Sequence, residues 1–162
     1  MIVFRCTQRL AKRLRVTLAD DALPSAGSLG DWYVNALNVG PARHVLCLSE
    51  RTLLPVILPA RKSEFPSRFS DYLEAVLQHL KISTPLIERE LSTSGQPVFA
   101  KTKSRALLGS LNDFIFNASV LVEHGATPFE ANIRLAEMPS KVIGYGFPSE
   151  AAREAIVSHR PR

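Results

Sequence analysis

The stretch RHVLCLSERTLLPVILPA, residues 43–60, consists of two apolar runs on either side of a polar turn at Ser49 to Arg51. Apolar runs of this length around a short polar break predict a β-hairpin whose strands are largely buried. Pro55 lies in the second run and has no backbone N–H to donate to a neighbouring strand. We therefore expect the second strand to lie at an edge of the sheet or to carry a bulge.

Further elements are predicted on both sides of this hairpin. Short apolar segments predict strands at 1–6 and 96–102. Helical periodicity and capping signals predict helices over 7–15, 69–80, 84–91, 104–122, 127–138 and 150–157. Thr84 and Thr127 are the expected N-caps of their helices, each followed by a proline. The segment 29–37 is also expected to be helical, because Ser28 and Asp31 have the spacing of a capping box.

These elements predict an α+β fold with a small, partly antiparallel sheet of about four strands covered by helices. The chain has 162 residues, of which 46% are hydrophobic, enough for a core that needs no disulfide or metal. We find no internal repeat and no low-complexity linker, so we expect a single domain over residues 1–162.

The net charge is +5, and much of it lies at the two ends of the chain. The basic residues there are Arg5, Arg9, Lys12, Arg13, Arg15, Arg153, Arg160 and Arg162. This charge is compatible with nucleic acid or another polyanion, and also with an ordinary solvated surface, because no Lys/Arg run reaches five residues. No apolar window is long enough for a membrane span and no signal peptide begins the sequence, so we expect a cytoplasmic protein.

Within the helix predicted over 7–15, Arg9, Lys12 and Arg13 lie on the side opposite Leu10 and Leu14. We expect the three basic residues to be exposed and the two leucines to be buried.

Cysteines and histidines give no sign of a metal or cofactor. Cys6 and Cys47 are expected to be free thiols buried in strands. None of the four histidines stands near another His, Cys or carboxylate at metal-ligand spacing. A dinucleotide fingerprint and a P-loop are both missing. We therefore expect no cofactor.

The segment KTKSRALLGSLNDF, residues 101–114, predicts a junction from a strand to a helix. In an extended chain Lys101 and Lys103 project to the same side, and Arg105 follows just inside the helix. Thr102 or Ser104 is expected to cap this helix. Cationic side chains beside free N–H groups at a helix start predict an anion site.

Farther along this helix, Arg105, Gly109 and Asn112 share one flank, and Asp113 lies on the other. Gly109 leaves a notch that admits either a ligand or the backbone of a neighbouring element. The structural alternative is that Arg105 pairs with an acid such as Asp113 and that Asn112 holds an adjacent loop.

Five segments together resemble a family of small bacterial proteins whose domain has no known function. The segments are RCTQRL (5–10), LGDWYVNAL (29–37), SERTLLPVILPA (49–60), KTKSRALLGSLNDF (101–114) and MPSKVIGYGFP (138–148). The resemblance covers nearly the whole chain and implies a member of that family. It implies no activity and no catalytic residue.

Two functions fit these observations. The first is a non-enzymatic binding or regulatory protein whose ligand is an anion, a nucleic-acid backbone or a partner protein. Its expected site consists of Lys101, Thr102, Lys103, Arg105, Asn112 and Asp113. The second is an enzyme acting on a phosphorylated or nucleotide substrate, with Lys101 and Arg105 holding phosphate and Asp113 as a base. A deep pocket joining these residues favours the enzyme, and a flat basic surface favours binding.

Overall fold

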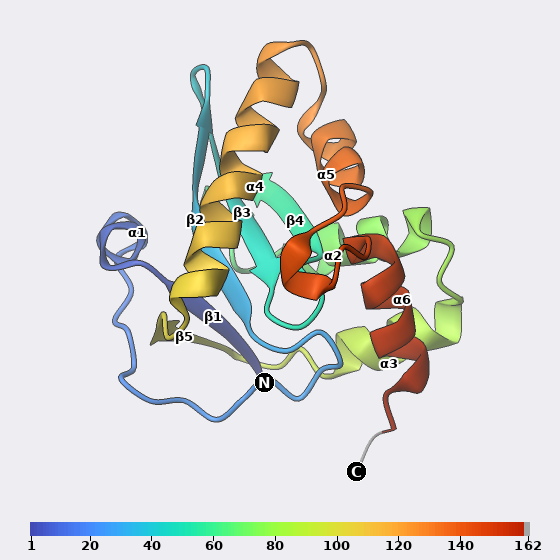
Figure 1. Ribbon diagram of the computed structural model, residues 1–162. Coiled ribbons are helices and arrows are strands. Elements are labelled where there is room, and N and C mark those ends of the chain that lie inside the picture. The colour runs from blue at the N-terminus through green and yellow to red at the C-terminus, as the bar shows by residue number, and fades with distance from the viewer. Residues whose placement is uncertain (161–162) are drawn as a thin grey trace.

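The structure is a computed structural model that describes residues 1–160. Its centre is a five-stranded sheet with helices on both faces (Figure 1). The strands are β1 (Ile2–Cys6), β2 (Trp32–Val39), β3 (Ala42–Ser49), β4 (Pro55–Pro59) and β5 (Pro97–Lys101). The helices are α1 (Gln8–Leu14), α2 (Phe69–His79), α3 (Thr84–Ser92), α4 (Arg105–Glu123), α5 (Pro128–Ala136), the short 3-10 helix η1 (Lys141–Ile143) and α6 (Pro148–Ser158). Arg162, one of the basic residues at the end of the sequence, lies outside the described residues.

The strand order across the sheet is β4-β3-β2-β1-β5. β1 pairs in parallel with both β2 and β5, whereas β2, β3 and β4 pair in antiparallel fashion. The expected α+β class with a partly antiparallel sheet is therefore confirmed, and the sheet has five strands where about four were expected.

The additional strand is β2, and the helix expected over 29–37 is wrong. Trp32 and Val34 are buried in the core on one face of the sheet, and Tyr33 and Leu37 are buried on the other. A strand that is buried on both faces carries apolar residues at nearly every position. It therefore lacks the alternation of apolar and polar residues that separates a strand from a helix in a sequence.

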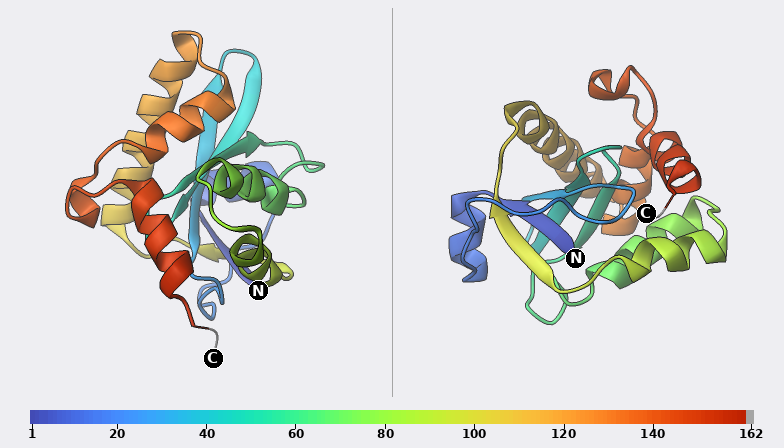
Figure 2. Two further views of the ribbon diagram at one scale, coloured as in Figure 1. Left: turned by 90° about the vertical axis from the view of Figure 1, so that its right-hand side faces the viewer. Right: turned by 90° about the horizontal axis from the view of Figure 1, so that it is seen from below.

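Helices cover the two faces of the sheet with separate apolar cores. Figure 2 shows α2 and α3 on one side of the sheet and α4 and α5 on the other. Among the buried residues of the first core are Phe4, Trp32, Val56, Phe69 and Leu77. Among those of the second are Tyr33, Leu46, Leu111, Phe114 and Leu135. The last helix, α6, packs against α3 and α5.

The predicted hairpin is confirmed as β3 and β4, and β4 is an edge strand as the position of Pro55 indicated. The outer edge of β4 is not left open. Asn132 of α5 is buried, and its side-chain amide donates to the carbonyl of Pro55 at 2.8 Å. The oxygen of the same side chain accepts from the N–H of Ile57 at 2.7 Å. One side chain thus takes the place of a sixth strand at this point.

The predicted helices are also present, with small shifts at their ends. Thr127 caps α5 as expected, and its hydroxyl accepts from the N–H of Glu130 at 3.1 Å. Thr84 is not the N-cap of α3, because the helix begins at Thr84 and Ser83 occupies the cap position.

Cys6 and Cys47 are free and buried, as expected. They lie on either side of Val34 in one row across β1, β2 and β3. Two strand spacings amount to about 10 Å, which is beyond the reach of a disulfide. Burial raises the pKa of Cys6 to about 12, so its thiol stays protonated at neutral pH.

Candidate functional site

The junction predicted at residues 101–105 lies where β5 ends and α4 begins. Ser104 is the N-cap of α4, and its hydroxyl accepts from the N–H of Leu107 at 3.2 Å. The parallel neighbour β1 ends beside it and leads into α1. α1 and α4 pack into the cores on opposite faces of the sheet. In open α/β sheets, ligands bind at the carboxyl ends of adjacent parallel strands whose connections leave to opposite faces.

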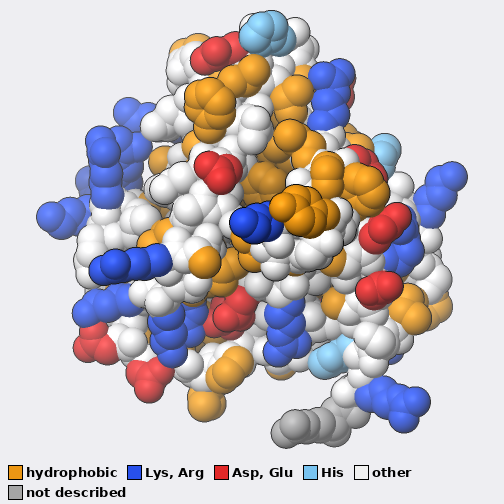
Figure 3. All heavy atoms as spheres, in the orientation of Figure 1, with side chains coloured by type: hydrophobic (Ala, Val, Ile, Leu, Met, Phe, Trp, Pro, Cys, Tyr) orange, Lys and Arg blue, Asp and Glu red, His pale blue; other side chains and the backbone are white. Residues whose placement is uncertain are grey.

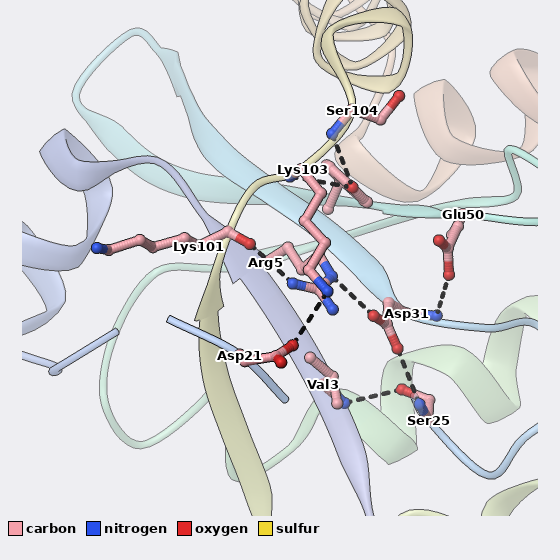
Figure 4. Close-up of polar contacts among 10 residues, drawn as sticks. Val3, Arg5, Asp21, Ser25, Asp31, Glu50, Lys101, Lys103 and Ser104 are labelled. Atoms are coloured by element: carbon pink, nitrogen blue, oxygen red, sulfur yellow. Dashed lines mark hydrogen bonds and ion pairs between the residues drawn. The ribbon is translucent and has the colours of Figure 1, made fainter. Parts of the chain in front are cut away.

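Two buried side chains hold this junction in place (Figure 4). The hydroxyl of Tyr33 accepts from the N–H groups of Lys103 at 3.4 Å and of Ser104 at 3.3 Å. The guanidinium of Arg5 donates through Nη1 to the carbonyl of Lys101 at 2.8 Å. Both side chains therefore fix the backbone at the point where the strand turns into the helix.

Arg5 also forms a buried ion pair with Asp31, the residue that precedes β2. Its Nε donates to Oδ2 of Asp31 at 2.7 Å, and the two side chains are only 4% and 3% exposed. The other oxygen of Asp31 accepts from the N–H of Ser25 at 2.8 Å. Asp31 is thus committed to Arg5 and to the loop, and it does not form the expected capping box with Ser28. The sequence signal for Arg5 was a single charge inside an apolar strand.

The two lysines of the predicted site carry ion pairs with the loop between α1 and β2. Lys101 pairs with Asp20, and Lys103 pairs with Asp21 at 3.3 Å. Hydrogen bonding and charge from Lys101 lower the pKa of Asp20. The lysines do not project together as expected, because Lys101 points toward α1 while Lys103 extends toward Asp21 (Figure 4). Exposed pairs of this kind are weak, so a competing anion can exchange with either carboxylate.

The remaining predicted residues lie on or near the start of α4. Thr102 is half-buried, and Arg105, Asn112 and Asp113 are exposed. Asn112 is seven positions after Arg105, which places them about 10 Å apart along the helix at 1.5 Å per residue. Within residues 1–160 neither Arg105 nor Asp113 takes part in an ion pair. These three side chains line an open helix surface.

Gly109 lies on the same open surface. A Cβ built at this position meets no atom within 4 Å, so no neighbouring element packs against the glycine. Replacing Gly109 by alanine should therefore raise the free energy of unfolding by about 1 kcal/mol, the difference in helix propensity between the two residues. Urea unfolding of the variant measures this change. A loss of stability would show that another group occupies the space.

The β5–α4 junction lies on one side of the end of β1. A groove lies on the opposite side, between α1 and β2. β1 pairs with β2 only as far as Val34, so the rest of β2 extends past it. The groove has a volume of about 310 Å³, and among its lining residues are Arg9 and Arg13 of α1 and Asn35 and Asn38 of β2. Neither arginine has a carboxylate partner within residues 1–160.

The exposure of α1 largely agrees with the sequence. Arg9, Lys12 and Arg13 are exposed and Leu10 is buried, while Leu14 is half-buried. Figure 3 shows basic side chains gathered on the side of the molecule that carries α1 and the end of β5. Asn35 and Asn38 were not predicted as site residues, because the segment that contains Asn35 was expected to be a helix.

The comparison with protein families matches residues 3–151 to the family described as a domain of unknown function, DUF6933. The chain belongs to this family. The matched range runs from β1 into α6 and includes both the β5–α4 junction and the α1–β2 groove of this DUF6933 domain. No curated protein and no solved structure matches the chain.

Two further observations concern residues 1–160 of the DUF6933 domain. No three His, Cys, Asp or Glu side chains lie close enough together there to hold a metal ion. None of the helices in that range combines the length and the apolar character needed to cross a membrane.

Proposed function

We propose that this DUF6933 protein binds the phosphate backbone of nucleic acid on the basic surface formed by α1 and the carboxyl ends of β1 and β5. The observation that carries the proposal is the groove whose lining includes Arg9 and Arg13 of α1 together with Asn35 and Asn38 of β2. Arg9 and Arg13 stand four residues apart and therefore lie on one side of α1, one turn from each other. Both guanidinium groups are free of carboxylate partners within the described residues.

The chemistry of the groove suits phosphodiester oxygens. Arginine donates two parallel hydrogen bonds to a phosphate, and amide side chains such as those of Asn35 and Asn38 add further donors. The hydroxyl of Thr7, which also lines the groove, already donates a hydrogen bond to the side-chain oxygen of Asn35 at 3.5 Å. The same oxygen accepts from the N–H of Ala36 at 2.8 Å, so the Asn35 amide nitrogen is directed away from these contacts.

The β5–α4 junction extends the proposed surface. Lys101 and Lys103 exchange Asp20 and Asp21 for phosphate, and Arg105 with the start of α4 adds a further positive site. Thr102, Asn112 and Asp113 border this region.

The geometry favours binding over catalysis at this place. The enzyme alternative needs Lys101, Arg105, Asn112 and Asp113 around one pocket. Within residues 1–160, none of these four residues lines the α1–β2 groove. Arg105 and Asp113 stand eight residues apart on an exposed helix surface, about 12 Å along its axis. This separation argues against one compact pocket that holds both side chains.

Changing Arg9, Lys12 and Arg13 together to serine should weaken binding of a fluorescent oligonucleotide. The slope of log affinity against log salt should fall by about 2, because each phosphate contact on a single strand contributes about 0.7. Fluorescence anisotropy over a range of salt concentrations measures both quantities.

The matched control carries the same loss of charge on the far side of the molecule. Arg134, Lys141 and Arg160 are exposed and lie away from α1, on or after α5, η1 and α6. Serine at these three positions should leave the salt slope unchanged. If both triple variants lost the same affinity and salt slope, net charge alone would explain the effect. The proposed binding surface at α1 would then be wrong.

A further inference from the structure

A second arginine-lined hollow lies beyond the β2–β3 hairpin. It has a volume of about 490 Å³, and its lining includes Arg43 and His44 of β3, Pro59 of β4, and Arg61 and Glu64 of the segment that follows. Arg43 and Arg61 are exposed, and neither has an ion-pair partner within residues 1–160. The sequence showed no motif at these two positions.

The other titratable groups of this hollow do not cancel its positive charge. Burial lowers the pKa of His44, with a hydrogen bond to the backbone of Ala42 acting in the opposite direction, so the imidazole is neutral at pH 7. Glu64 accepts from the hydroxyl of Tyr72 at 2.9 Å and lies 3.6 Å from Nη1 of Arg68. The carboxylate of Glu64 is therefore shared with Tyr72 and Arg68, and the two arginines leave the lining of the hollow with a net positive charge.

The two hollows adjoin each other across the hairpin. Asn38 lines the α1–β2 groove, Arg43 lines the second hollow, and the two residues are direct partners across β2 and β3. Side chains of cross-strand partners lie on the same face of a sheet. In the left-hand view of Figure 2 the tip of this hairpin extends past α2, so α2 does not cover the tip on that face of the sheet. A chain-like ligand can therefore pass from one hollow to the other.

The distance between the hollows sets the length of the ligand. β2 and β4 are two strand spacings apart, which amounts to about 10 Å. This distance is longer than a single phosphate group reaches, so a strand that bridges the two hollows brings more than one phosphate. Each hollow has the size of a small-molecule site, about 300–1,000 Å³, which admits one nucleotide unit and not a base-paired helix.

We propose that the α1–β2 groove and the second hollow form one trough for single-stranded nucleic acid, in which Arg9 and Arg13 bind one end of a short run of phosphates and Arg43 and Arg61 bind the other. This inference rests on the proposed function and adds the form and minimum length of the ligand. Occupation of both ends by one strand makes the second contact intramolecular, which raises affinity without any change in the individual contacts.

The test compares a labelled dinucleotide with a labelled single strand of about twelve nucleotides, within the usual range of single-strand site sizes. The wild-type protein should bind the longer strand at least about tenfold more tightly than the dinucleotide. Changing Arg43 and Arg61 to serine should remove most of this difference, because the longer strand then has only one end of the trough to bind. The exposed pair Arg134 and Lys141, changed to serine, is the matched control and should behave as the wild type does.

Each other outcome counts against a specific statement. Equal affinity for the two lengths, or a full length effect in the Arg43/Arg61 variant with an unchanged melting temperature, overturns the trough and leaves the proposed function in place. Tighter binding of a duplex of the same length overturns the single-stranded form of the ligand. If neither oligonucleotide binds the wild-type protein, the proposed function itself fails.

Discussion

Replacing Asp31 by alanine should lower the free energy of unfolding by about 3–5 kcal/mol, the usual cost of removing one partner from a buried ion pair. Arg5 would keep its charge inside the protein, with its Nε facing the place that the carboxylate occupied at 2.7 Å. The N–H of Ser25 would lose its acceptor in the same change. Urea unfolding followed by tryptophan fluorescence measures the loss, since Trp32 is buried next to Asp31 in the sequence.

The exposed ion pair between Arg68 and Asp71 provides the control for this prediction. Their side chains are 54% and 60% exposed, so solvent already screens the charges. Asp71→Ala should leave the unfolding midpoint almost unchanged. Similar losses in the Asp31 and Asp71 variants would contradict the statement that burial of Arg5 determines the effect.

Asn132→Ala should also be strongly destabilising, because it removes the hydrogen-bond partner of two backbone groups at the edge of β4. The N–H of Ile57 and the carbonyl of Pro55 both bond to this one buried side chain. An orphaned buried group costs about 1–3 kcal/mol, so the two together give an expected loss of roughly 2–6 kcal/mol. Thermal and urea unfolding of the variant measure this loss.

Asn112 supplies the comparison for Asn132. It is exposed on α4 and makes no side-chain hydrogen bond within residues 1–160. Asn112→Ala should change the free energy of unfolding by no more than about 0.5 kcal/mol, as is usual for surface substitutions. If Asn132→Ala changed the free energy of unfolding as little as Asn112→Ala, water would replace Asn132 as the hydrogen-bond partner of Ile57 and Pro55, and the prediction would be wrong.

Most of the helices and the β3–β4 hairpin could be predicted because their signals are local. Thr127 caps α5 through an N–H three residues later, and Pro55 indicates an edge strand by its own chemistry. β2 could not be recognised in the same way. Its burial on both faces depends on two helical layers that come from distant parts of the chain, so its pattern resembled that of a helix.

In the candidate site, too, the features set by neighbouring residues could be predicted, and the contacts between distant residues could not. The junction after Lys101 was predictable, since a short strand and the cap at Ser104 are neighbours in the sequence. The pairing of Lys101 with Asp20 joins residues 81 positions apart, and the contact of Arg5 with the Lys101 carbonyl joins residues 96 positions apart. Spacing within a segment carries no information about contacts over such separations.

The position of β1 between β2 and β5 has a consequence for folding on the ribosome. β1 pairs with β5 along its whole length, yet 90 residues separate Cys6 from Pro97. At a synthesis rate of about 5–20 residues per second, the β5 side of β1 has no partner strand for roughly 5 to 20 seconds after β1 itself is made. During that interval the nascent chain exposes an apolar strand edge of the kind that promotes aggregation. Completion of the sheet by β5 and formation of the β5–α4 junction are therefore the same late event in the synthesis of the protein.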